Sequence, residues 1–437
     1  MNAKRQTIWL SCPFRQPRHN NLLIEIIKQL KPLSHFRQIV SKSQKLDLDS
    51  NAWHVKKNLM LKICLNVIAS CLITIILLES SLWLFHPLPF SPLACRYPYR
   101  NNIKGLKPLV IYERNMFGLR SVSLSQATSL FKRPNTIRIL CIGASTTDQL
   151  TQNTEDLWSS ILELKLQKEL ANNGYRIEVA AYGRGGDTVL DTYAWLKNNL
   201  VSFSPDIVIT LFGINDLCWG GRNPLKNTGE QQVNAKEDRW KRALRSFSQI
   251  YRHVSKIREG FSIKSAIKSG KAIPWGTGYL PIVWDAYKKY PFVENVSRRP
   301  DPIDNFEKIF SDLLDYLKKQ HIQTIVLAQP VLWQKKMKQE ELEVLWFPVA
   351  TESGYVRAST EWLEMEMNKY NQVQKKCAES KEFIYIPLDM CIPKTTEMFF
   401  DDCHFTDQGN VLVADAIYPV LLSEVKKMKA GKLRLAE

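Results

Sequence analysis

Residues 137–150 read IRILCIGASTTDQL. A nearly unbroken apolar run, typical of a strand buried on both faces, ends at Gly143 and is followed by the hydroxyl side chains of Ser145, Thr146 and Thr147. In open α/β sheets, a strand that leads through a glycine-containing turn into a helix places that turn at a ligand site. The pattern therefore predicts a buried parallel strand followed by a functional turn.

Strand and helix patterns alternate from this point to the carboxyl end of the chain. The predicted strands are residues 137–142, 176–181, 206–212, 322–328 and 382–388, and the predicted helices are residues 156–173, 188–200, 303–319, 361–379 and 407–428. Near-continuous apolar strands separated by helices are typical of a parallel sheet covered on both faces. The sequence therefore predicts an α/β fold with a parallel five-stranded sheet, whose carboxyl edge carries the site.

Polar and glycine residues follow four of these strands. The first is followed by GASTT with Ser145, the second by YGRGGDT with Gly186, and the third by FGINDL with Asn215. The fifth is followed by FFDDCHFTDQG, which contains Asp401 and His404. Taken singly, such residues are most often helix caps, turn formers or surface pairs. Their succession at one edge of a single sheet favours a shared catalytic site.

These four segments resemble the sequence blocks of the SGNH hydrolase superfamily, the GDSL-like esterases and lipases, over about residues 109–425. Two of the family's blocks are intact in this sequence, GxND at residues 213–216 and DxxH at residues 401–404. Ala144 stands where the GDS form has an aspartate, and Ala181 stands where the family usually has an asparagine. The resemblance implies a flavodoxin-like three-layer α/β/α fold.

The resemblance also implies the roles of individual residues. The implied catalytic triad is Ser145, His404 and Asp401, and the implied oxyanion hole is formed by Ser145, Gly186 and Asn215. A serine hydroxyl needs a base to take its proton, a carboxylate orients that base, and hydrogen-bond donors stabilise the developing oxyanion. Asp402 is the competing partner for the histidine, but the DxxH spacing favours Asp401. No metal or cofactor is implied.

Residues 63–85 form an apolar run in which Glu79 is the only ionisable residue. A helix of this length crosses a hydrocarbon core of roughly 30 Å. The alternatives are a buried core helix, which the lack of a polar face argues against, and a cleaved signal peptide, for which the run is long. Basic residues are more frequent before the run than just after it, which predicts a cytoplasmic amino terminus and a periplasmic or extracellular catalytic domain.

The predicted organisation has four parts. These are a basic, poorly ordered tail (1–59), a transmembrane signal anchor (60–86), a linker and pre-domain segment (87–135), and a hydrolase domain (136–428) with insertions at about 218–300 and 335–360. Within the first insertion, residues 236–271 carry eleven basic and three acidic residues. Such a segment lies on an anionic membrane, contacts an acidic substrate or, most commonly, packs on its own domain. The second insertion is predicted to form a wall of the active site.

Charge and cysteine content narrow the function classes. Of the net charge of +17, residues 1–62 supply +9, with twelve basic and three acidic residues. No nucleic-acid recognition motif accompanies this charge, so nucleic-acid binding is not predicted. The nine cysteines include no CxxC pair, which argues against a zinc or redox motif. Cys391 and Cys403 are candidates for a disulfide in an oxidising compartment.

The predicted function is therefore a membrane-tethered serine esterase that acts on an O-acyl group of a cell-envelope glycan or lipid. An O-acyltransferase of a surface polysaccharide, using the same triad, remains an alternative because a sugar hydroxyl can replace water. A non-catalytic envelope assembly factor is a second alternative, although it would have no need of all five site residues. A phosphate-binding interpretation of GASTT leaves the DxxH segment without a role.

Overall fold

The computed structural model divides the chain into two compact units, which are described separately. One unit comprises residues 1–12, 89–242 and 260–437, and the other comprises residues 13–88 and 243–259. The structure describes residues 10–11, 50–85, 94–125, 127, 130–170, 174–219, 244, 248–255, 257–258, 273–274, 284–285, 287–296 and 302–434.

The first unit is built on a five-stranded parallel sheet in the order β12-β9-β6-β4-β5. Its strands are β4 (Thr136–Gly143), β5 (Arg176–Tyr182), β6 (Ile207–Leu211), β9 (Gln323–Leu327) and β12 (Ile384–Ile386). When the five strands are numbered 1 to 5 along the chain, their spatial order across the sheet is the flavodoxin-like order 2-1-3-4-5. The predicted fold class is confirmed, and the order of the strands reverses between β4 and β6, where α/β sheets bind their ligands.

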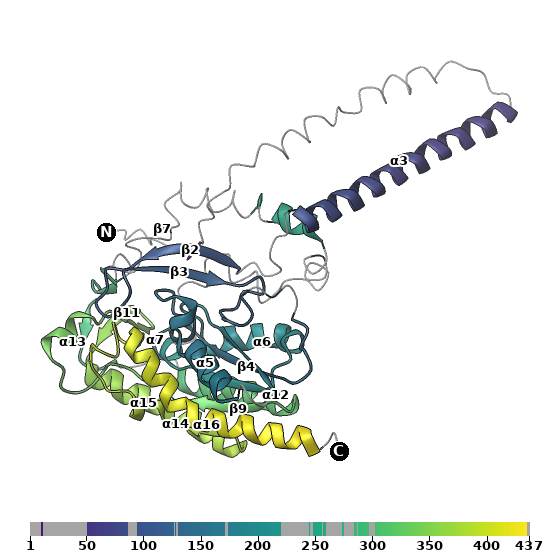
Figure 1. Cartoon of the computed structure of the whole chain (residues 1–437). Helices are drawn as coiled ribbons and strands as arrows, with labels where there is room; N and C mark the ends of the chain where they lie inside the picture. Colours follow the sequence, from purple (N-terminus) through teal and green to yellow (C-terminus); the bar gives the residue numbers. More distant parts are fainter. Residues whose placement is uncertain are drawn as a thin grey trace, which may run out of the picture. The chain divides into compact units, whose positions relative to one another are not determined.

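Helices cover both faces of this sheet (Figure 1). One face carries α5 (Trp158–Leu170) and α16 (Asp407–Arg434), and the other carries α6 (Val189–Phe203), α12 (Pro302–Lys319) and α14 (Thr360–Ser380). Alternate residues of β4 enter opposite cores, since Leu140 and Ile142 face α6 and α12 whereas Ile139 and Cys141 face α5 and α16. This two-sided burial explains the nearly continuous apolar sequence of the strand.

Short elements lie at or near the carboxyl edge of the sheet and in the insertions. Those that follow sheet strands are α4 (Ser145–Asp148), η1 (Thr154–Asp156), α7 (Ile214–Trp219) and α15 (Leu388–Cys391). The second insertion forms α13 (Gln339–Glu343), β10 (Val349–Thr351) and β11 (Gly354–Ala358), and β11 also pairs with β8 (Phe292–Val293). The remaining short strands, β1 (Leu10–Ser11) and β7 (Ile273–Pro274), pair with each other.

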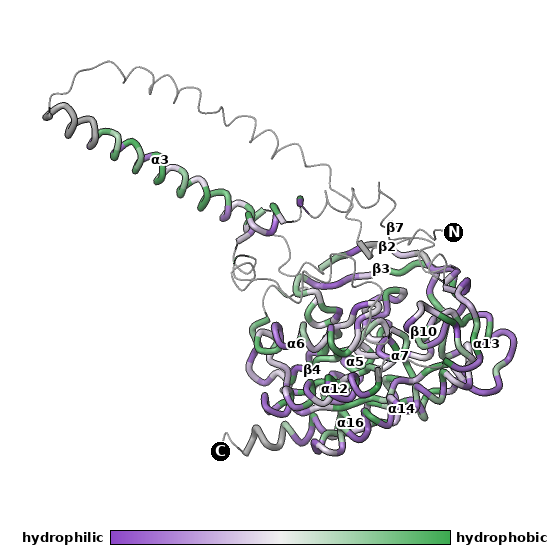
Figure 2. The backbone as a smooth tube through the Cα atoms, turned by 180° about the vertical axis from the view of Figure 1, so that it is seen from behind, coloured by the Kyte–Doolittle hydropathy of each residue, from purple (hydrophilic) through white to green (hydrophobic). Residues whose placement is uncertain are grey.

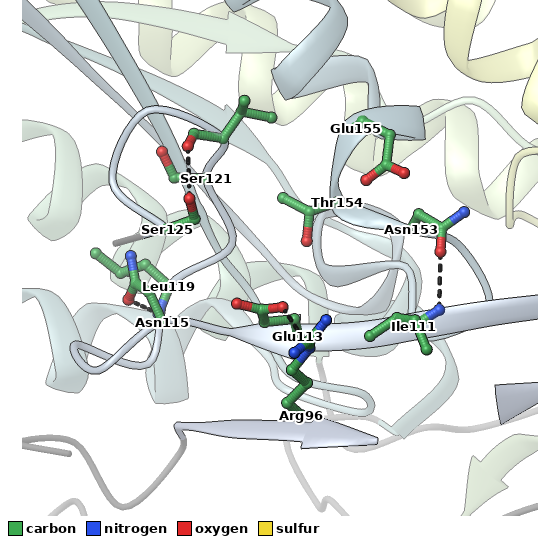
Figure 3. A pocket seen from close by; sticks show the side chains of 11 residues that line it. Arg96, Ile111, Glu113, Asn115, Leu119, Ser121, Ser125, Asn153, Thr154 and Glu155 are labelled. Carbon is green, nitrogen blue, oxygen red and sulfur yellow. Dashed lines mark hydrogen bonds and ion pairs between the residues drawn. The ribbon is translucent and has the colours of Figure 1, made fainter. Parts of the chain in front are cut away.

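The segment expected to be a linker before the domain contains two antiparallel strands, β2 (Cys95–Arg100) and β3 (Leu109–Arg114). At the edge of β3, the backbone N–H of Ile111 donates to the Asn153 side chain at 2.8 Å, beside the pocket in Figure 3. On one face of the strand, Tyr112 and Arg114 are buried. The segment therefore folds against the catalytic unit instead of only leading into it.

The second unit contains α3 (Ser50–Phe85), the only described helix that is long and apolar enough to cross a membrane. Figure 2 shows hydrophobic residues along most of its length, and their large side chains are exposed. The helix begins at Ser50, ten residues before the predicted anchor. Residues 50–59 contain no proline or glycine, so nothing in this stretch interrupts the helix. The expected disorder of the earlier tail lies outside the described residues.

Part of the basic insertion packs on α3 within this second unit. The Glu79 carboxylate accepts hydrogen bonds from the Ser248 hydroxyl at 3.0 Å and from the backbone N–H groups of Gln249 and Ile250. The guanidinium of Arg252 lies 5.0 Å from the ring centre of Trp83. The lone acidic side chain of the apolar run thus binds the start of a helical segment. Most of residues 236–271 lies outside the described part of the chain, so the alternatives of a membrane or a substrate contact stay open.

Candidate active site

The predicted nucleophile lies at the carboxyl end of the central strand. Ser145 is the first residue of α4 and is half-buried, and it follows β4 by a single residue, Ala144. The loop after β5 is packed tightly against this turn, because a Cβ on Gly183 would lie 2.2 Å from the carbonyl oxygen of Ala144. Only glycine permits such an approach of two backbones. The first and second sequence blocks are therefore in direct contact.

The predicted oxyanion-hole residues come from the loops after β5 and β6. Gly186 has a φ of +81°, a left-handed conformation that favours glycine. The side-chain amide of Asn215 donates to the carbonyl oxygen of Asp187 at 2.8 Å, and its oxygen accepts from the Trp219 indole at 3.1 Å. These two bonds fix the orientation of the Asn215 amide. They also place Asn215 beside the turn that contains Gly186.

Asp401 and His404 are hydrogen-bonded to each other. Nδ1 of His404 lies 2.9 Å and 2.7 Å from the two carboxylate oxygens of Asp401, whose side chain is 1% exposed. One of these oxygens also accepts from the backbone N–H groups of Cys403 and His404. Burial alone raises the pKa of Asp401, but the charge of His404 and these hydrogen bonds outweigh burial, so the pKa lies below its ordinary value. Asp401 is therefore ionised at neutral pH.

Asp402 makes a separate set of contacts, away from the imidazole. One of its oxygens accepts from the Trp333 indole at 2.7 Å, and the other accepts from the backbone N–H groups of Trp346 and Phe347 at 2.8 and 3.2 Å. Burial, together with the negative charge of Asp401, raises the pKa of Asp402 to about 7. Of the two adjacent acids, the described contacts pair Asp401 with the histidine and leave Asp402 holding the second insertion in place.

Aromatic side chains enclose the imidazole. The ring of Phe400 is stacked on His404 with centroids 5.5 Å apart, and the ring of Phe347 lies 6.2 Å away. The Trp346 indole donates to the second oxygen of Asp401 at 3.0 Å. Trp346 and Phe347 come from the second insertion, so that insertion contributes side chains to the site. The sequence predicts a wall of the active site here, and the structure adds the contacts of Trp346 with Asp401 and of Phe347 with His404.

Hydrogen bonds and a ring contact link the separate loops into one region of the first unit. Gln152, just beyond α4, donates to the carbonyl oxygen of Phe405 at 3.1 Å and accepts from Asn410 at 2.8 Å. Trp219, which orients Asn215, lies 6.1 Å from Phe347 beside the histidine. Among the described contacts, no hydrogen bond joins the Ser145 hydroxyl to His404, so that pairing stays a prediction. Catalytic hydrogen bonds are often loose until substrate binds.

Cys391 and Cys403 do not form the disulfide considered from the sequence. Both are free thiols, Cys391 exposed and Cys403 buried. Asp401, Cys403 and His404 each have an atom of a kind that binds metal ions, and these three atoms lie within 4.8 Å of one another. The carboxylate of Asp401 is already engaged by the imidazole and by two backbone N–H groups. This bonding pattern is typical of a histidine oriented by a carboxylate.

A family model described as GDSL-like lipase/acylhydrolase matches residues 139–417. A search of curated proteins found no match. Among solved structures, the acetyl xylan esterase AlAXEase is 15% identical, with 65% of this chain and 99% of that chain covered and a TM-score of 0.36.

Two further solved structures show similar values. Axe2, an acetylxylan esterase from Geobacillus stearothermophilus, is 14% identical, covers 64% of this chain and 92% of its own, and has a TM-score of 0.36. LAE5, an alpha/beta hydrolase from the metagenome of Lake Arreo, is 14% identical, with 66% and 95% covered and a TM-score of 0.35. Because the family model matches more than half of the chain, this protein belongs to the GDSL-like lipase/acylhydrolase family, the SGNH esterases, and is an ester hydrolase.

Proposed function

We propose that this protein is a serine esterase that removes an O-acyl group from a cell-envelope glycan or lipid, with Ser145 as nucleophile, His404 as general base and Asp401 as the carboxylate that orients the base. The observation that carries this proposal is the 2.7 Å contact between Nδ1 of His404 and buried Asp401. With Nδ1 bound to a carboxylate, the proton of a neutral imidazole resides on Nδ1, and Nε2 accepts a proton.

The first half-reaction forms an acyl-enzyme. The Ser145 oxygen attacks the ester carbonyl while Nε2 of His404 takes the hydroxyl proton, which gives a tetrahedral oxyanion beside an imidazolium. The negative charge of Asp401 stabilises that imidazolium. When the oxyanion collapses, the bond to the alcohol oxygen breaks and the imidazolium returns its proton to the leaving alkoxide.

The developing oxyanion is stabilised by the backbone N–H groups of Ser145 and Gly186 and by the Asn215 amide. Asn215 gives one N–H to Asp187, which leaves its second N–H for the oxyanion. The bond from Trp219 holds the amide oxygen away from the negative charge. Preorganised donors of this kind each contribute about 3 kcal/mol to transition-state stabilisation.

Water resolves the acyl-enzyme in the second half-reaction. His404 takes a proton from water as the water oxygen attacks the acyl carbonyl and forms a second tetrahedral intermediate. When this intermediate collapses, the bond between the acyl carbon and the Ser145 oxygen breaks, the imidazolium returns its proton to that oxygen, and the carboxylic acid is released. If a sugar hydroxyl replaces that water, the same residues perform acyl transfer. The two reactions differ only in the acceptor, so the experiment must offer both.

The cell-envelope assignment rests on α3. Residues Asn58–Phe85 are long and apolar enough to cross a membrane, and basic residues precede them. We propose that this helix anchors the enzyme with its amino terminus in the cytoplasm and its catalytic unit outside. Reporter enzymes fused before Ser50 and after Glu437 test this orientation, and activity of a cytoplasm-specific reporter at the carboxyl end would contradict it.

A fluorophosphonate probe tests the chemistry. We expect it to label wild-type protein and the Ser125→Ala variant, whose serine is exposed in the same unit, but not the Ser145→Ala variant. Equal labelling of Ser145→Ala would exclude Ser145 as the nucleophile. No labelling of folded wild-type protein would favour the non-catalytic assembly factor.

Substrate class is measured next with aryl esters of increasing acyl length. The release of the phenol is followed with and without an oligosaccharide acceptor, and the products are analysed for acylated sugar. Free acid as the main product in both mixtures supports the esterase. Acylated sugar as the main product would make the enzyme an acyltransferase.

A further inference from the structure

Arg114, at the end of β3, lies outside the matched family region and is buried beside the predicted nucleophile turn. Its Nη2 forms an ion pair with the carboxylate of Asp148 at 2.7 Å, in the last turn of α4. The same Nη2 donates to the backbone carbonyl of Gly183, in the loop that leads to Gly186. One guanidinium therefore bonds both the element that begins with Ser145 and the loop that carries Gly186.

Tyr112 completes this arrangement from the same face of β3. Its hydroxyl accepts from Nε of Arg114 at 2.6 Å and lies 2.9 Å from both carboxylate oxygens of Asp148, to which it donates. Nη1 of Arg114 donates to the Gly118 carbonyl at 3.0 Å. The guanidinium is thus held by the segment before the sheet and cannot turn away from Asp148 and Gly183 without breaking these bonds.

Arg120 also binds the nucleophile turn, at the carboxyl end of α4. It donates to the backbone carbonyls of Asp148 and Gln149, and to that of Gln152 at 2.6 Å. These are the carbonyl groups at and after the end of α4, a helix of only four residues. So short a helix has only a few backbone hydrogen bonds of its own to keep its position. Side chains from residues 112–120 add buried bonds to it, beside the bond that the Trp158 indole donates to the Thr146 carbonyl.

An oxyanion hole built from two loops works only if those loops keep their relative position. The proposed donors are the N–H groups of Ser145 and Gly186, which belong to the two segments that Arg114 joins. A displacement of about 1 Å at an active site can lower the rate about a hundredfold, even when the altered residue is remote from the reacting atoms. A buried Arg that bridges the two loops fixes this distance.

We infer that Arg114 is a positioning residue for catalysis, which sets the separation of the nucleophile turn and the oxyanion loop through Asp148 and Gly183. This inference rests on the proposed function of Ser145. It makes β2 and β3, which precede the residues that the family model matches, a required part of the catalytic unit. Arg114 itself touches neither substrate nor reacting atoms.

The test compares Arg114→Met with Arg138→Met in the full-length protein. Arg138 is a matched control, because it is equally buried, pairs with Glu178 at 2.7 Å and donates to the carbonyls of Leu130 and Phe203. It lies in the amino-terminal half of β4, away from the predicted site. Both variants lose a buried ion pair, so both are expected to lose thermal stability.

The kinetic readouts separate positioning from stability. For Arg114→Met we expect kcat on an aryl ester to fall about a hundredfold with KM changed less than about threefold, and fluorophosphonate labelling to slow in parallel. For Arg138→Met we expect kcat within about threefold of wild type. Guanidinium ion, at concentrations that leave the wild-type rate unchanged, should restore activity to Arg114→Ala.

Three results would overturn the inference. These are an unchanged kcat in folded Arg114→Met, an equal loss of kcat in Arg138→Met, and no response of folded Arg114→Ala to guanidinium. If the Arg114 variants do not fold, Tyr112→Phe keeps the ion pair and removes one hydroxyl, and kcat should then fall about tenfold. An unchanged kcat in that variant would also overturn the inference. Full activity of Ser145→Ala would instead refute the proposed function itself.

Discussion

Nδ1 of His404 contacts both carboxylate oxygens of Asp401, whereas the neighbouring Asp402 bonds an indole and two backbone N–H groups of other segments. Two adjacent acids therefore have different environments. Asp401 has a lowered pKa and remains charged, while the pKa of Asp402 is raised to about 7. This division leads to the first prediction.

Asp401→Asn should lower kcat by about 10⁴, because an amide no longer holds the imidazole tautomer or stabilises the imidazolium. Asp402→Asn should keep kcat within about tenfold of wild type but reduce stability by about 1–3 kcal/mol, since one of its N–H partners loses an acceptor. Steady-state hydrolysis of an aryl ester and thermal denaturation measure the two effects. The reverse ranking of kcat would assign the histidine partner to Asp402.

Asn215→Ala should lower kcat by about 10²–10³ with a smaller change in KM, because one oxyanion donor is lost. Trp219→Phe is the matched comparison, since it removes the indole N–H that orients the amide oxygen and keeps a smaller aromatic ring at this position. Its loss should be smaller, about tenfold. Equal activity of Asn215→Ala and wild type would remove Asn215 from the oxyanion hole.

Gly183→Ala should strongly reduce activity, because the new Cβ would lie 2.2 Å from the Ala144 carbonyl and push the loop away from the nucleophile turn. Gly185→Ala, two residues later, meets no atom within 4 Å and should be tolerated. Labelling rates with a fluorophosphonate compare the pair directly. Similar rates for both variants would show that the two backbones can separate without harm.

Glu163, in α5, gives a prediction for pH. Burial raises its pKa from 4.5 to about 7, although hydrogen bonds from Ser123 and Val179 favour the charged form. Between these values the folded state binds a proton that the unfolded state has released, so stability falls as pH rises. The full cost at pH 8 is on the order of 3 kcal/mol, because each pKa unit corresponds to about 1.4 kcal/mol.

Glu163→Gln removes this buried charge and should therefore stabilise the protein at pH 8 relative to wild type, with less effect at pH 5. The measurement is the melting temperature of both proteins at each pH. The raised pKa values of Asp187 and Asp402, both about 7, give wild type and variant a remaining decline in the same direction. If the melting temperatures of the two proteins differed by the same amount at both pH values, the pH-dependent loss of stability would not come from Glu163.

The amino-acid sequence by itself determined the elements of the sheet and the turns that follow them. Each β-strand of the central sheet lies within a predicted apolar segment or extends one by a single residue, at both ends for β4 and at the carboxyl end for β5. Local periodicity carries this information, because burial on two faces demands a continuous apolar run. The five predicted site residues rest on short motifs that resemble the SGNH sequence blocks, namely Ser145, Gly186, Asn215, Asp401 and His404.

Only the tertiary structure decided which partners these residues meet. Trp346 binds Asp401 from 55 positions away, and Arg114 binds Gly183 from 69 positions away. No periodicity records such contacts, because they depend on how separate segments pack in three dimensions. The sequence predicts a linker and pre-domain segment at residues 87–135, and no motif in it marks Arg114. Its contribution appears only when the guanidinium is seen between two loops of the site.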